Sequence, residues 1–208
     1  AARNAYAPAR AATCAGTPLP WHTRRGALVA LASELAIATG ISGKIARDVA
    51  LMMQFELGET FEPAEAGRGG SSAMPHKRNP VRCMLTVSAS LRTPGLMATL
   101  LSGMVQEHER ALGGWQAEWD TLPEIASLCG AALTQMRDVI EGLKVDAERM
   151  RANVDLTRGL VMAEAVSLAL AEHIGRSHAH ELVEAACQRA LAQGGELLDV
   201  LRADPQVT

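Results

Sequence analysis

Apolar residues recur at steps of three, four or seven along three long segments of this chain, and no other feature of the sequence constrains the fold as strongly. The first segment runs from residue 25 to residue 52, the second resumes after Pro80, and the third covers residues 125–143. This spacing places apolar side chains along one face of a helix. The first stripe consists of Leu28, Leu31, Leu35, Ala38, Ile45, Val49 and Met52. Three such stripes predict a bundle of long helices.

The fold class predicted for the whole chain is all-α. Aromatic residues make up only 3% of the sequence, and runs of β-branched residues are scarce, so no sheet of any size is expected. Beyond Leu156 the pattern shortens to helices near 159–174, 178–192 and 195–202, with breaks at Gly175 and Gly194. We therefore expect an irregular, truncated start over 1–24, a long-helix bundle over 25–156 that contains a loop at 57–80, and a small helical C-terminal domain over 157–208.

Glycines and prolines inside the long segments predict local features. Gly40 and Gly43 each cost a helix up to about 1 kcal/mol against alanine, so they indicate a bend or a tight helix crossing. Pro94 and Gly95 predict a kink or a break in the second helix. Pro123 is expected at the N-terminus of the third helix, where a proline is tolerated.

Composition narrows the class of protein. With 208 residues, 48% of them hydrophobic, the chain can bury the core of one or two domains, and a net charge of −3 gives no basic stripe for nucleic acid. The four cysteines lie far apart, which predicts reduced thiols rather than a metal site. No uninterrupted apolar run reaches the roughly 18 residues of a membrane span, and no secretory leader is recognisable. We expect a cytoplasmic protein that binds neither nucleic acid nor membrane.

The loop at 57–80 contains the stretch "GGSSAMPHKRNP", residues 69–80. Its glycines allow backbone amides to approach a ligand, and hydroxyls, a histidine, two cations and an amide follow. These groups suit an anion. Composition alone leaves an equally good alternative, a solvated basic turn.

The order of residues 70–80, Gly-Ser-Ser-x-Met-Pro-x-Lys-x-Asn-Pro, resembles the signature of the fumarase/aspartase superfamily. The resemblance extends over most of the chain after residue 21. It implies a central bundle of long helices, a small helical third domain, and homotetramers whose active sites are assembled from three subunits. It also implies β-elimination or addition next to a carboxylate, with no cofactor and no metal. Members of the superfamily are considerably longer than this chain.

The resemblance assigns roles to the residues of the signature. Ser71 is implied as the catalytic residue that abstracts the proton of the carbon acid, and Lys77 and Asn79 as ligands of a substrate carboxylate. Ser72 would supplement them in binding substrate. His76 and Arg78 are candidates for substrate binding, although an exposed charged turn needs neither.

Two departures indicate a branch of the superfamily. Where many members have a glutamate that orients a catalytic histidine, five residues after the signature asparagine, this chain has Met84. In adenylosuccinate lyase a serine and an arginine follow the arginine of a His-Glu-Arg segment and grip a phosphate; the residues here are Trp115 and Trp119, after Arg110. Two neutral indoles cannot replace that clamp. The two tryptophans are also interpretable as a core stripe.

The segments "LPWHTRR", "GKIARDVALMMQ" and "HERALGGWQAEW" are similar to the 3-carboxy-cis,cis-muconate cycloisomerase branch. This similarity implies lactonisation of a tricarboxylate, in which a carboxylate oxygen adds across a conjugated double bond. Arg110 and His108 are then candidates for binding substrate carboxylates, although Arg110 is equally placed for an ion pair with Glu107 or Glu118. His22 is a weaker candidate for the same cleft.

Other interpretations stay open at this point. His173, His178 and His180 are too sparse for a metal site and are expected to be solvated. Adenylosuccinate lyase, or another lyase of the superfamily, is the first alternative function. The second is a non-catalytic assembly fragment, because the superfamily's remaining active-site segments would lie outside these 208 residues, and the isolated chain is then expected to be inactive.

Overall fold

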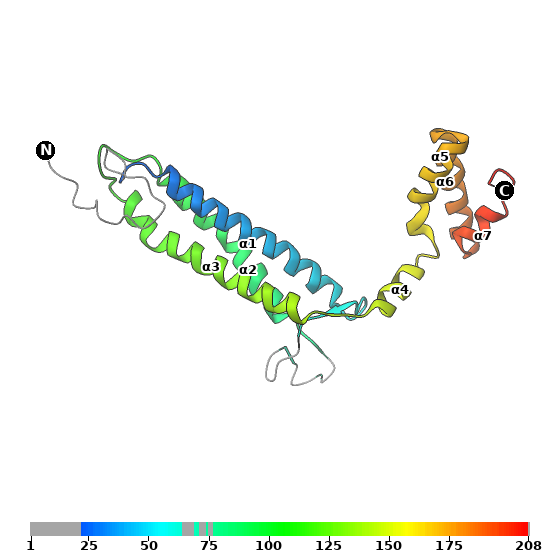
Figure 1. Cartoon of the computed structure of the whole chain (residues 1–208), viewed down its shortest axis with the longest axis horizontal. Helices are drawn as coiled ribbons and strands as arrows, with labels where there is room; N and C mark the ends of the chain where they lie inside the picture. The colour runs from blue at the N-terminus through cyan, green and yellow to red at the C-terminus, as the bar shows by residue number, and fades with distance from the viewer. Residues whose placement is uncertain (1–21, 64–68, 71–73, 75–76, 208) are drawn as a thin grey trace. The chain divides into compact units, whose positions relative to one another are not determined.

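The computed structural model describes residues 22–63, 69–70, 74 and 77–207 of the chain. Helices dominate these residues, which confirms the predicted all-α class (Figure 1). The helices are α1 (Gly26–Met52), α2 (Val81–Ser102), α3 (Gly114–Gly142), α4 (Ala147–Asp155), α5 (Ala163–Ile174), α6 (Arg176–Gln193) and α7 (Leu197–Arg202). A 3-10 helix, η1 (Leu160–Met162), precedes α5, and two short strands, β1 (Thr60–Phe61) and β2 (Lys144–Val145), pair with each other.

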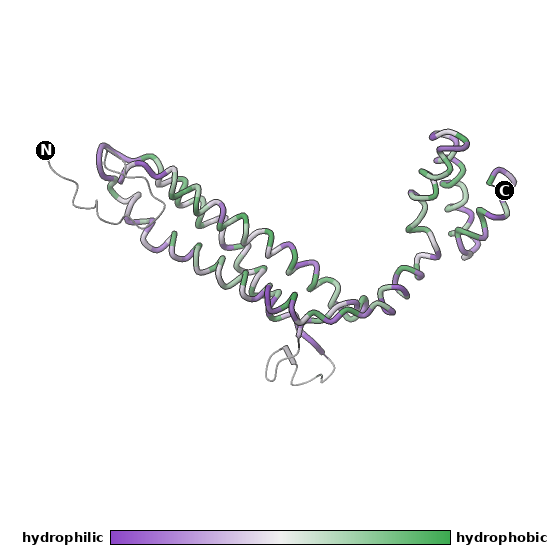
Figure 2. Tube along the Cα trace, viewed as in Figure 1, coloured by the Kyte–Doolittle hydropathy of each residue, from purple (hydrophilic) through white to green (hydrophobic). Residues whose placement is uncertain are grey.

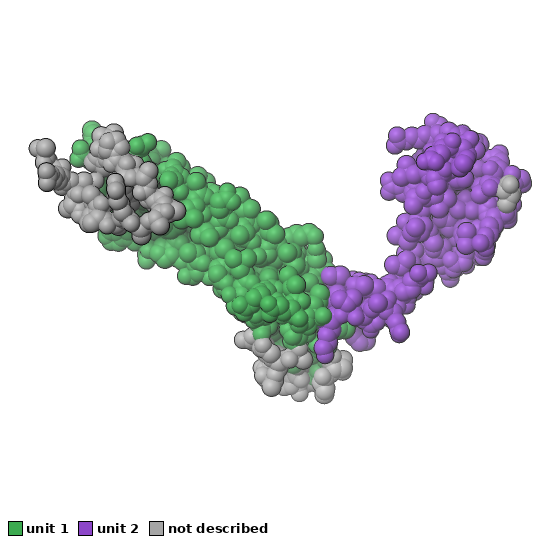
Figure 3. All heavy atoms as spheres, in the orientation of Figure 1, with its two compact units in different colours: residues 1–51, 61–143 green, residues 52–60, 144–208 purple. Residues whose placement is uncertain are grey.

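The chain divides into two compact units. Residues 1–51 and 61–143 form the bundle unit, and residues 52–60 and 144–208 form the C-terminal unit (Figure 3). The sequence pattern placed the boundary at 156/157 and assigned residues 147–155 to the bundle. In the structure α4, which those residues form, lies in the C-terminal unit.

Helices α1, α2 and α3 form the bundle unit around a shared apolar core. Polar and hydrophobic positions alternate along all three helices, as an amphipathic bundle requires (Figure 2). The core cluster consists of Val29, Ala32, Met97, Leu100 and Ile125. Full burial of each of the larger side chains in this cluster, the valine, methionine, leucine and isoleucine, stabilises the fold by roughly 1.5–3 kcal/mol.

The buried line of α1 differs from the stripe predicted from sequence. Leu31 lies on the exposed side, whereas the buried positions are mostly small. They are Val29, Ala32, Thr39, Ser42, Gly43, Ala46 and Val49. Small residues let helix axes approach closely. The face of α1 that packs in this unit is therefore the one with small residues, and the face with larger apolar side chains such as Leu31 is exposed.

Of Gly40 and Gly43, the two glycines in the interior of α1, one lies at a tight helix crossing. A Cβ atom added to Gly43 would lie 2.3 Å from Ser90 Oγ and 2.4 Å from Ser90 Cβ on α2. A Cβ atom added to Gly40 would meet nothing within 4 Å. The predicted tight crossing is therefore confirmed at Gly43 but not at Gly40.

Two helix ends predicted from prolines, a break at Pro94 and a helix start at Pro123, were wrong, and a kink at Pro94 stays a prediction. Pro94 lies inside α2, which continues without a break to Ser102, and Pro123 lies inside α3, which begins nine residues earlier at Gly114. A proline in a helix interior costs about 3 kcal/mol or more. Because α2 packs against α3, with Met97 and Leu100 buried after Pro94, the packed face outweighs that cost.

Among the helices in the described part of the chain, α1 is the one long and apolar enough to cross a membrane by length and composition. The core helix of a soluble protein passes the same test. Here Val29 and Ala32 of α1 lie in one apolar cluster with residues of α2 and α3. This contact is typical of a helix that packs in a protein core.

The C-terminal unit contains α4, η1, α5, α6 and α7. Its core consists of Leu182, Val183, Ala186, Leu197 and Leu201. The predicted breaks are confirmed: Gly175 has φ +83° and Gly194 has φ +65°, conformations that favour glycine. The predicted solvation of the three histidines is also confirmed, since His173, His178 and His180 are exposed.

Candidate active site

β1 lies within the predicted loop at 57–80, and the part after Glu62, residues 63–80, is called the signature loop and leads into α2. Of the residues with predicted roles, Lys77, Arg78 and Asn79 lie within the described part, and Ser71, Ser72 and His76 lie outside it. The Lys77 side chain is exposed, and its backbone N–H donates to the Met74 carbonyl at 3.0 Å. The ammonium of Lys77 is thus presented at the surface of this unit.

Asn79 joins the two described ends of the loop. Its backbone N–H and its Nδ2 both donate to the Gly69 carbonyl, at 2.8 Å and 3.2 Å. Gly69 has φ +78°, and a Cβ atom there would lie 3.1 Å from the Asn79 carbonyl oxygen, so only glycine suits this position. One N–H and the oxygen of the Asn79 carboxamide have no role in this bond and suit a carboxylate or hydroxyl ligand.

Arg78 points back toward the strand that precedes the loop. Its Nη2 donates to the Glu62 carbonyl at 3.0 Å, and the guanidinium carbon lies 4.6 Å from the centre of the Phe61 ring. Substrate binding by Arg78 stays a prediction. In this structure the side chain also ties residues 61–62 to the end of the signature.

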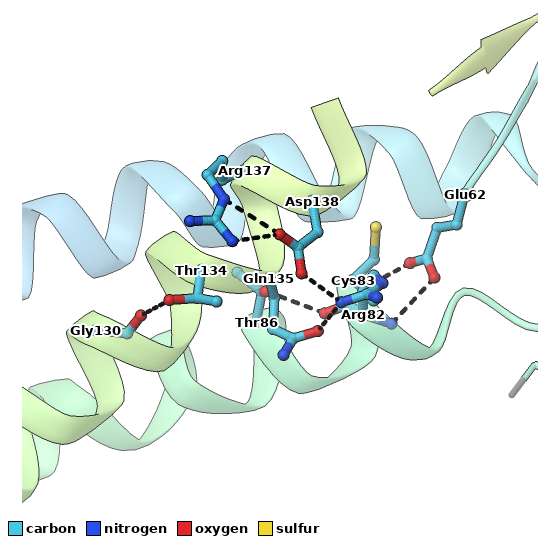
Figure 4. A network of polar contacts seen from close by, with 9 residues as sticks. All are labelled: Glu62, Arg82, Cys83, Thr86, Gly130, Thr134, Gln135, Arg137 and Asp138. Atoms are coloured by element: carbon cyan, nitrogen blue, oxygen red, sulfur yellow. Dashed lines mark hydrogen bonds and ion pairs between the residues drawn. The ribbon is translucent and has the colours of Figure 1, made fainter. Parts of the chain in front are cut away.

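Glu62 is the functional candidate that sequence reasoning missed. Its side chain is buried, with 7% exposure, and its carboxylate accepts the backbone N–H groups of Arg82 at 3.1 Å and Cys83 at 2.7 Å (Figure 4). These amides belong to the first turn of α2, whose N-cap, Pro80, has no side-chain acceptor. Burial, and secondly the hydrogen bond and charge of Glu62, raise the pKa of the Cys83 thiol.

A polar network continues from α2 to α3. Arg82 is buried and donates through Nη1 to Gln135 at 3.0 Å and to Asp138 Oδ2 at 2.9 Å (Figure 4). Arg137 donates to the other oxygen of Asp138 at 2.8 Å. The hydrogen bond from Arg137, and then the charges of Arg137 and Arg82, lower the pKa of Asp138. This network holds the start of α2 against the end of α3.

The second group of predicted residues lies at the other end of α2. His108 and Arg110 are exposed in the connection between α2 and α3, and His108 has φ +47°, which is uncommon for a residue other than glycine. Since α2 has 22 residues, the two ends are separated by about 33 Å at 1.5 Å per residue. The bundle unit therefore does not bring Lys77 and Asn79 together with His108 and Arg110. The loop before α2 and the connection after it lie at opposite ends of this helix (Figure 1).

An aromatic cluster lies at the same end of the bundle as Arg110. The ring centres of His22 and Trp115 are 5.4 Å apart, as are those of Trp115 and Trp119, both in edge-to-face geometry. Trp119 is 58% exposed. The interpretation of the two tryptophans as a core stripe was wrong for Trp119, whereas Trp115 is half-buried. The buried side of this part of α3 carries Glu118 and Thr121 instead.

Glu118 forms a buried ion pair that the sequence did not reveal. Arg25, 3% exposed, donates through Nε to Glu118 Oε1 at 2.8 Å, and its Nη2 binds the other carboxylate oxygen. Arg25 Nη1 also donates to the His22 carbonyl at 3.2 Å. The alternative ion pair of Arg110 with Glu118 is therefore wrong. The ion pair of Arg25 with Glu118 fixes the start of α1 and His22 against α3.

Within residues 22–63, 69–70, 74 and 77–207, no three His, Cys, Asp or Glu side chains come together in an arrangement that could bind a metal ion. The described polar groups of the candidate site are a lysine, two arginines, a histidine and a carboxamide. Such groups bind anions by charge and hydrogen bonds.

Comparison with known proteins gives this geometry a context. Two family models match the chain, "Lyase" over residues 4–95 and "Adenylosuccinate lyase C-terminus" over residues 159–208. Over 189 residues the chain is 56% identical to a 3-carboxy-cis,cis-muconate cycloisomerase of Pseudomonas putida and 57% identical to one of Pseudomonas aeruginosa. These matches cover 91% of this chain but only 45% and 41% of the relatives.

A solved structure shows the same fold. The crystal structure of the 3-carboxy-cis,cis-muconate lactonizing enzyme from Pseudomonas putida matches with a TM-score of 0.79 and 51% identity, over 92% of this chain and 42% of that one. The chain thus spans less than half the length of the relatives it matches.

Proposed function

Because this chain belongs to the fumarase/aspartase superfamily of lyases, we propose that the protein containing it is a 3-carboxy-cis,cis-muconate cycloisomerase. The reaction would convert 3-carboxy-cis,cis-muconate to 4-carboxymuconolactone, a step in the degradation of aromatic compounds. A carboxylate oxygen of the substrate adds to the conjugated double bond, and a proton is delivered to the carbon next to another carboxylate. Sequence identity above 50% to cycloisomerases is the observation that carries this proposal.

The chemistry requires cations and donors where negative charge develops. In either direction the reaction passes through an aci-carboxylate, in which the carbon next to a carboxylate lacks the proton that is exchanged and the carboxylate carries extra negative charge. Each preorganised hydrogen-bond donor to this charge stabilises it by roughly 3–4 kcal/mol. Lys77, with its exposed ammonium, and Asn79, with one free carboxamide N–H, are suited to this role. Ser71 would exchange the proton, and Ser72, His76 and Arg78 would assist binding.

The end of the bundle near Arg110 supports a tricarboxylate over a nucleotide substrate. Trp115 and Trp119 occupy the positions where adenylosuccinate lyase has the serine and arginine of its phosphate clamp, and Trp119 is exposed at that position. Neutral indoles give a phosphate dianion little stabilisation. Arg110 and His108, both exposed, remain suited to a substrate carboxylate.

Self-association is part of the proposal. The two groups of candidate residues lie at opposite ends of α2, about 33 Å apart. A substrate as small as carboxymuconate cannot reach both groups of one chain. We infer that each active site combines the signature loop of one subunit with the segment around Arg110 of another, as in a homotetramer with shared sites.

The proposed location is the cytoplasm. Among the described residues Cys83, Cys129 and Cys187 are free thiols, and Cys83 and Cys129 are buried. Free thiols are typical of a reducing compartment. The expected substrate is a small polycarboxylate; no role is proposed for a membrane or for nucleic acid.

Adenylosuccinate lyase is the second candidate function. The match of residues 159–208 to the C-terminal family model of that enzyme is the observation in its favour. The substitutions at Trp115 and Trp119 argue against it.

The test uses the intact protein and follows the loss of the diene's ultraviolet absorbance. Ser71→Ala is expected to lower kcat by about three orders of magnitude or more, since it removes the group that exchanges the proton. Ser88→Ala, an exposed serine on α2, is the matched control and is expected to retain the wild-type rate. A Ser71→Ala enzyme with near-normal kcat would contradict the role of this serine.

A further inference from the structure

Helix α2 begins without a cap of its own. Its N-cap residue is Pro80, which has no side-chain acceptor, so the orphan N–H groups of the first turn need a partner from elsewhere. Glu62, from the other side of the signature loop, supplies it: Oε2 accepts from Arg82 at 3.1 Å and Oε1 from Cys83 at 2.7 Å. A negative charge at a helix N-terminus is further stabilised by the helix dipole.

The same short segment also contacts the end of the signature. Arg78 Nη2 donates to the Glu62 carbonyl at 3.0 Å, and its guanidinium lies over the Phe61 ring. One residue further on, Asn79 donates twice to the Gly69 carbonyl. Residues 61–62, which precede the loop, thus contact its far end at two places, Arg78 and the first turn of α2, and Asn79 closes the loop on Gly69.

A capping residue within the helix's own sequence would not attach residues 61–62 to the start of α2. A serine or aspartate at position 80 would satisfy the first turn of α2 equally well, but it would leave residues 61–62 unattached to the helix. Using a buried carboxylate from the far side of the loop costs desolvation, which only charge-assisted hydrogen bonds offset. The carboxylate of Glu62 connects β1, which precedes the signature loop, to the start of α2, directly after Lys77 and Asn79.

We propose that Glu62 is a positioning residue of the active site, which fixes Lys77, Arg78 and Asn79 relative to the start of α2. It touches neither the substrate nor the reacting atoms; it acts through the amides of Arg82 and Cys83 and through its own carbonyl group. The effect on catalysis rests on the proposed function. The effect on the geometry of the loop base does not.

The test is Glu62→Gln in the intact protein, with the exposed Glu34→Gln on α1 as the matched control. Glutamine keeps the shape but replaces one acceptor oxygen by an NH₂ group that faces a backbone N–H. Two quantities are measured: kcat and KM for 3-carboxy-cis,cis-muconate, and hydrogen exchange at the amides of Asn79, Cys83 and Leu100. The first two amides report on the loop base and the cap, and Leu100 reports on the far end of α2.

For Glu62→Gln we expect exchange to accelerate by about 10- to 100-fold at both Cys83 and Asn79 and to stay unchanged at Leu100. We expect kcat to fall by at least about tenfold, with a smaller change in KM, because misplaced donors lose transition-state stabilisation. Glu34→Gln should change none of these quantities. Glu62→Asp, which keeps the charge but is one methylene shorter, should show intermediate values and serves if Glu62→Gln does not fold.

The positioning role is overturned if exchange accelerates at Cys83 but not at Asn79, since Glu62 would then be only a helix cap. It is also overturned if only thermal stability falls while kcat and the Asn79 amide stay as in wild type. If the wild-type protein leaves the muconate unchanged, the proposed function has failed. Exchange at Asn79 then decides the positioning role by itself.

Discussion

Gly43→Ala is expected to destabilise the bundle unit, whereas Gly40→Ala in the same helix is expected to stabilise it. Both glycines lie inside α1, and alanine is favoured over glycine in a helix interior by up to about 1 kcal/mol. At Gly40 nothing lies within 4 Å of the added methyl group, so this preference is the whole effect. At Gly43 the methyl group meets α2.

The steric cost at Gly43 follows from the geometry of the crossing. The new Cβ would lie 2.3 Å from Ser90 Oγ and 2.4 Å from Ser90 Cβ, far inside van der Waals contact, so α1 and α2 must move apart. Overpacking of this kind costs about 1–3 kcal/mol. After the propensity gain, Gly43→Ala should lower the free energy of unfolding by up to about 2 kcal/mol. The two variants should therefore differ by about 1–3 kcal/mol.

The assay is urea unfolding followed by circular dichroism at equal protein concentrations, because self-association makes apparent stability depend on concentration. Ser90→Gly should restore the stability of Gly43→Ala, whereas Ser90→Ala should not, since the Cβ atom that clashes is retained. Equal stabilisation by Gly40→Ala and Gly43→Ala would refute the close crossing of α1 and α2.

Three further predictions concern an ion pair, a carboxylate and a thiol of the bundle unit. Glu118→Leu should lower the free energy of unfolding by about 3–5 kcal/mol, because Arg25 then stays buried without its carboxylate partner. The double variant Arg25→Met/Glu118→Leu should lose less stability, and additive losses in urea unfolding would contradict this. Asp138→Asn should lower the free energy of unfolding at neutral pH, because Arg137 lowers the pKa of Asp138 and so stabilises its charged form. The difference in stability between wild type and variant should persist above about pH 4 and disappear as the pH falls through the lowered pKa of Asp138. Cys83 should resist alkylation at pH 8 in the native protein and react in urea, since burial raises its pKa; rapid labelling of the native protein would show that the thiol is accessible.

The long helices were predictable from periodicity because bundle packing imposes the same spacing on the sequence. Glycines at 175 and 194 ended helices as expected, since both adopt positive φ. Helix boundaries set by proline were not predictable. Pro123 carries the same local signal inside α3 as it would at a helix start, and only the packed residues before it, such as Glu118 and Thr121, reveal the difference.

The candidate site was predictable only in part. Residues 70–80 carry a recognisable order, so Lys77 and Asn79 were found from sequence. Glu62 was not, because its role depends on a contact with amides about 20 residues away, which have no side-chain signature. The absence of a side-chain cap at Pro80, before a helix, is the signal that could have revealed it. The pairing of Arg25 with Glu118, 93 residues apart, had no signal in the sequence at all.

The most direct test of the account is the selectivity of the intact protein between two substrates, 3-carboxy-cis,cis-muconate and adenylosuccinate, each followed by its ultraviolet absorbance. We predict loss of the muconate diene with adenylosuccinate left intact, because Trp115 and Trp119 stand where a phosphate clamp would be needed. Turnover of adenylosuccinate without loss of the diene would contradict the proposed cycloisomerase.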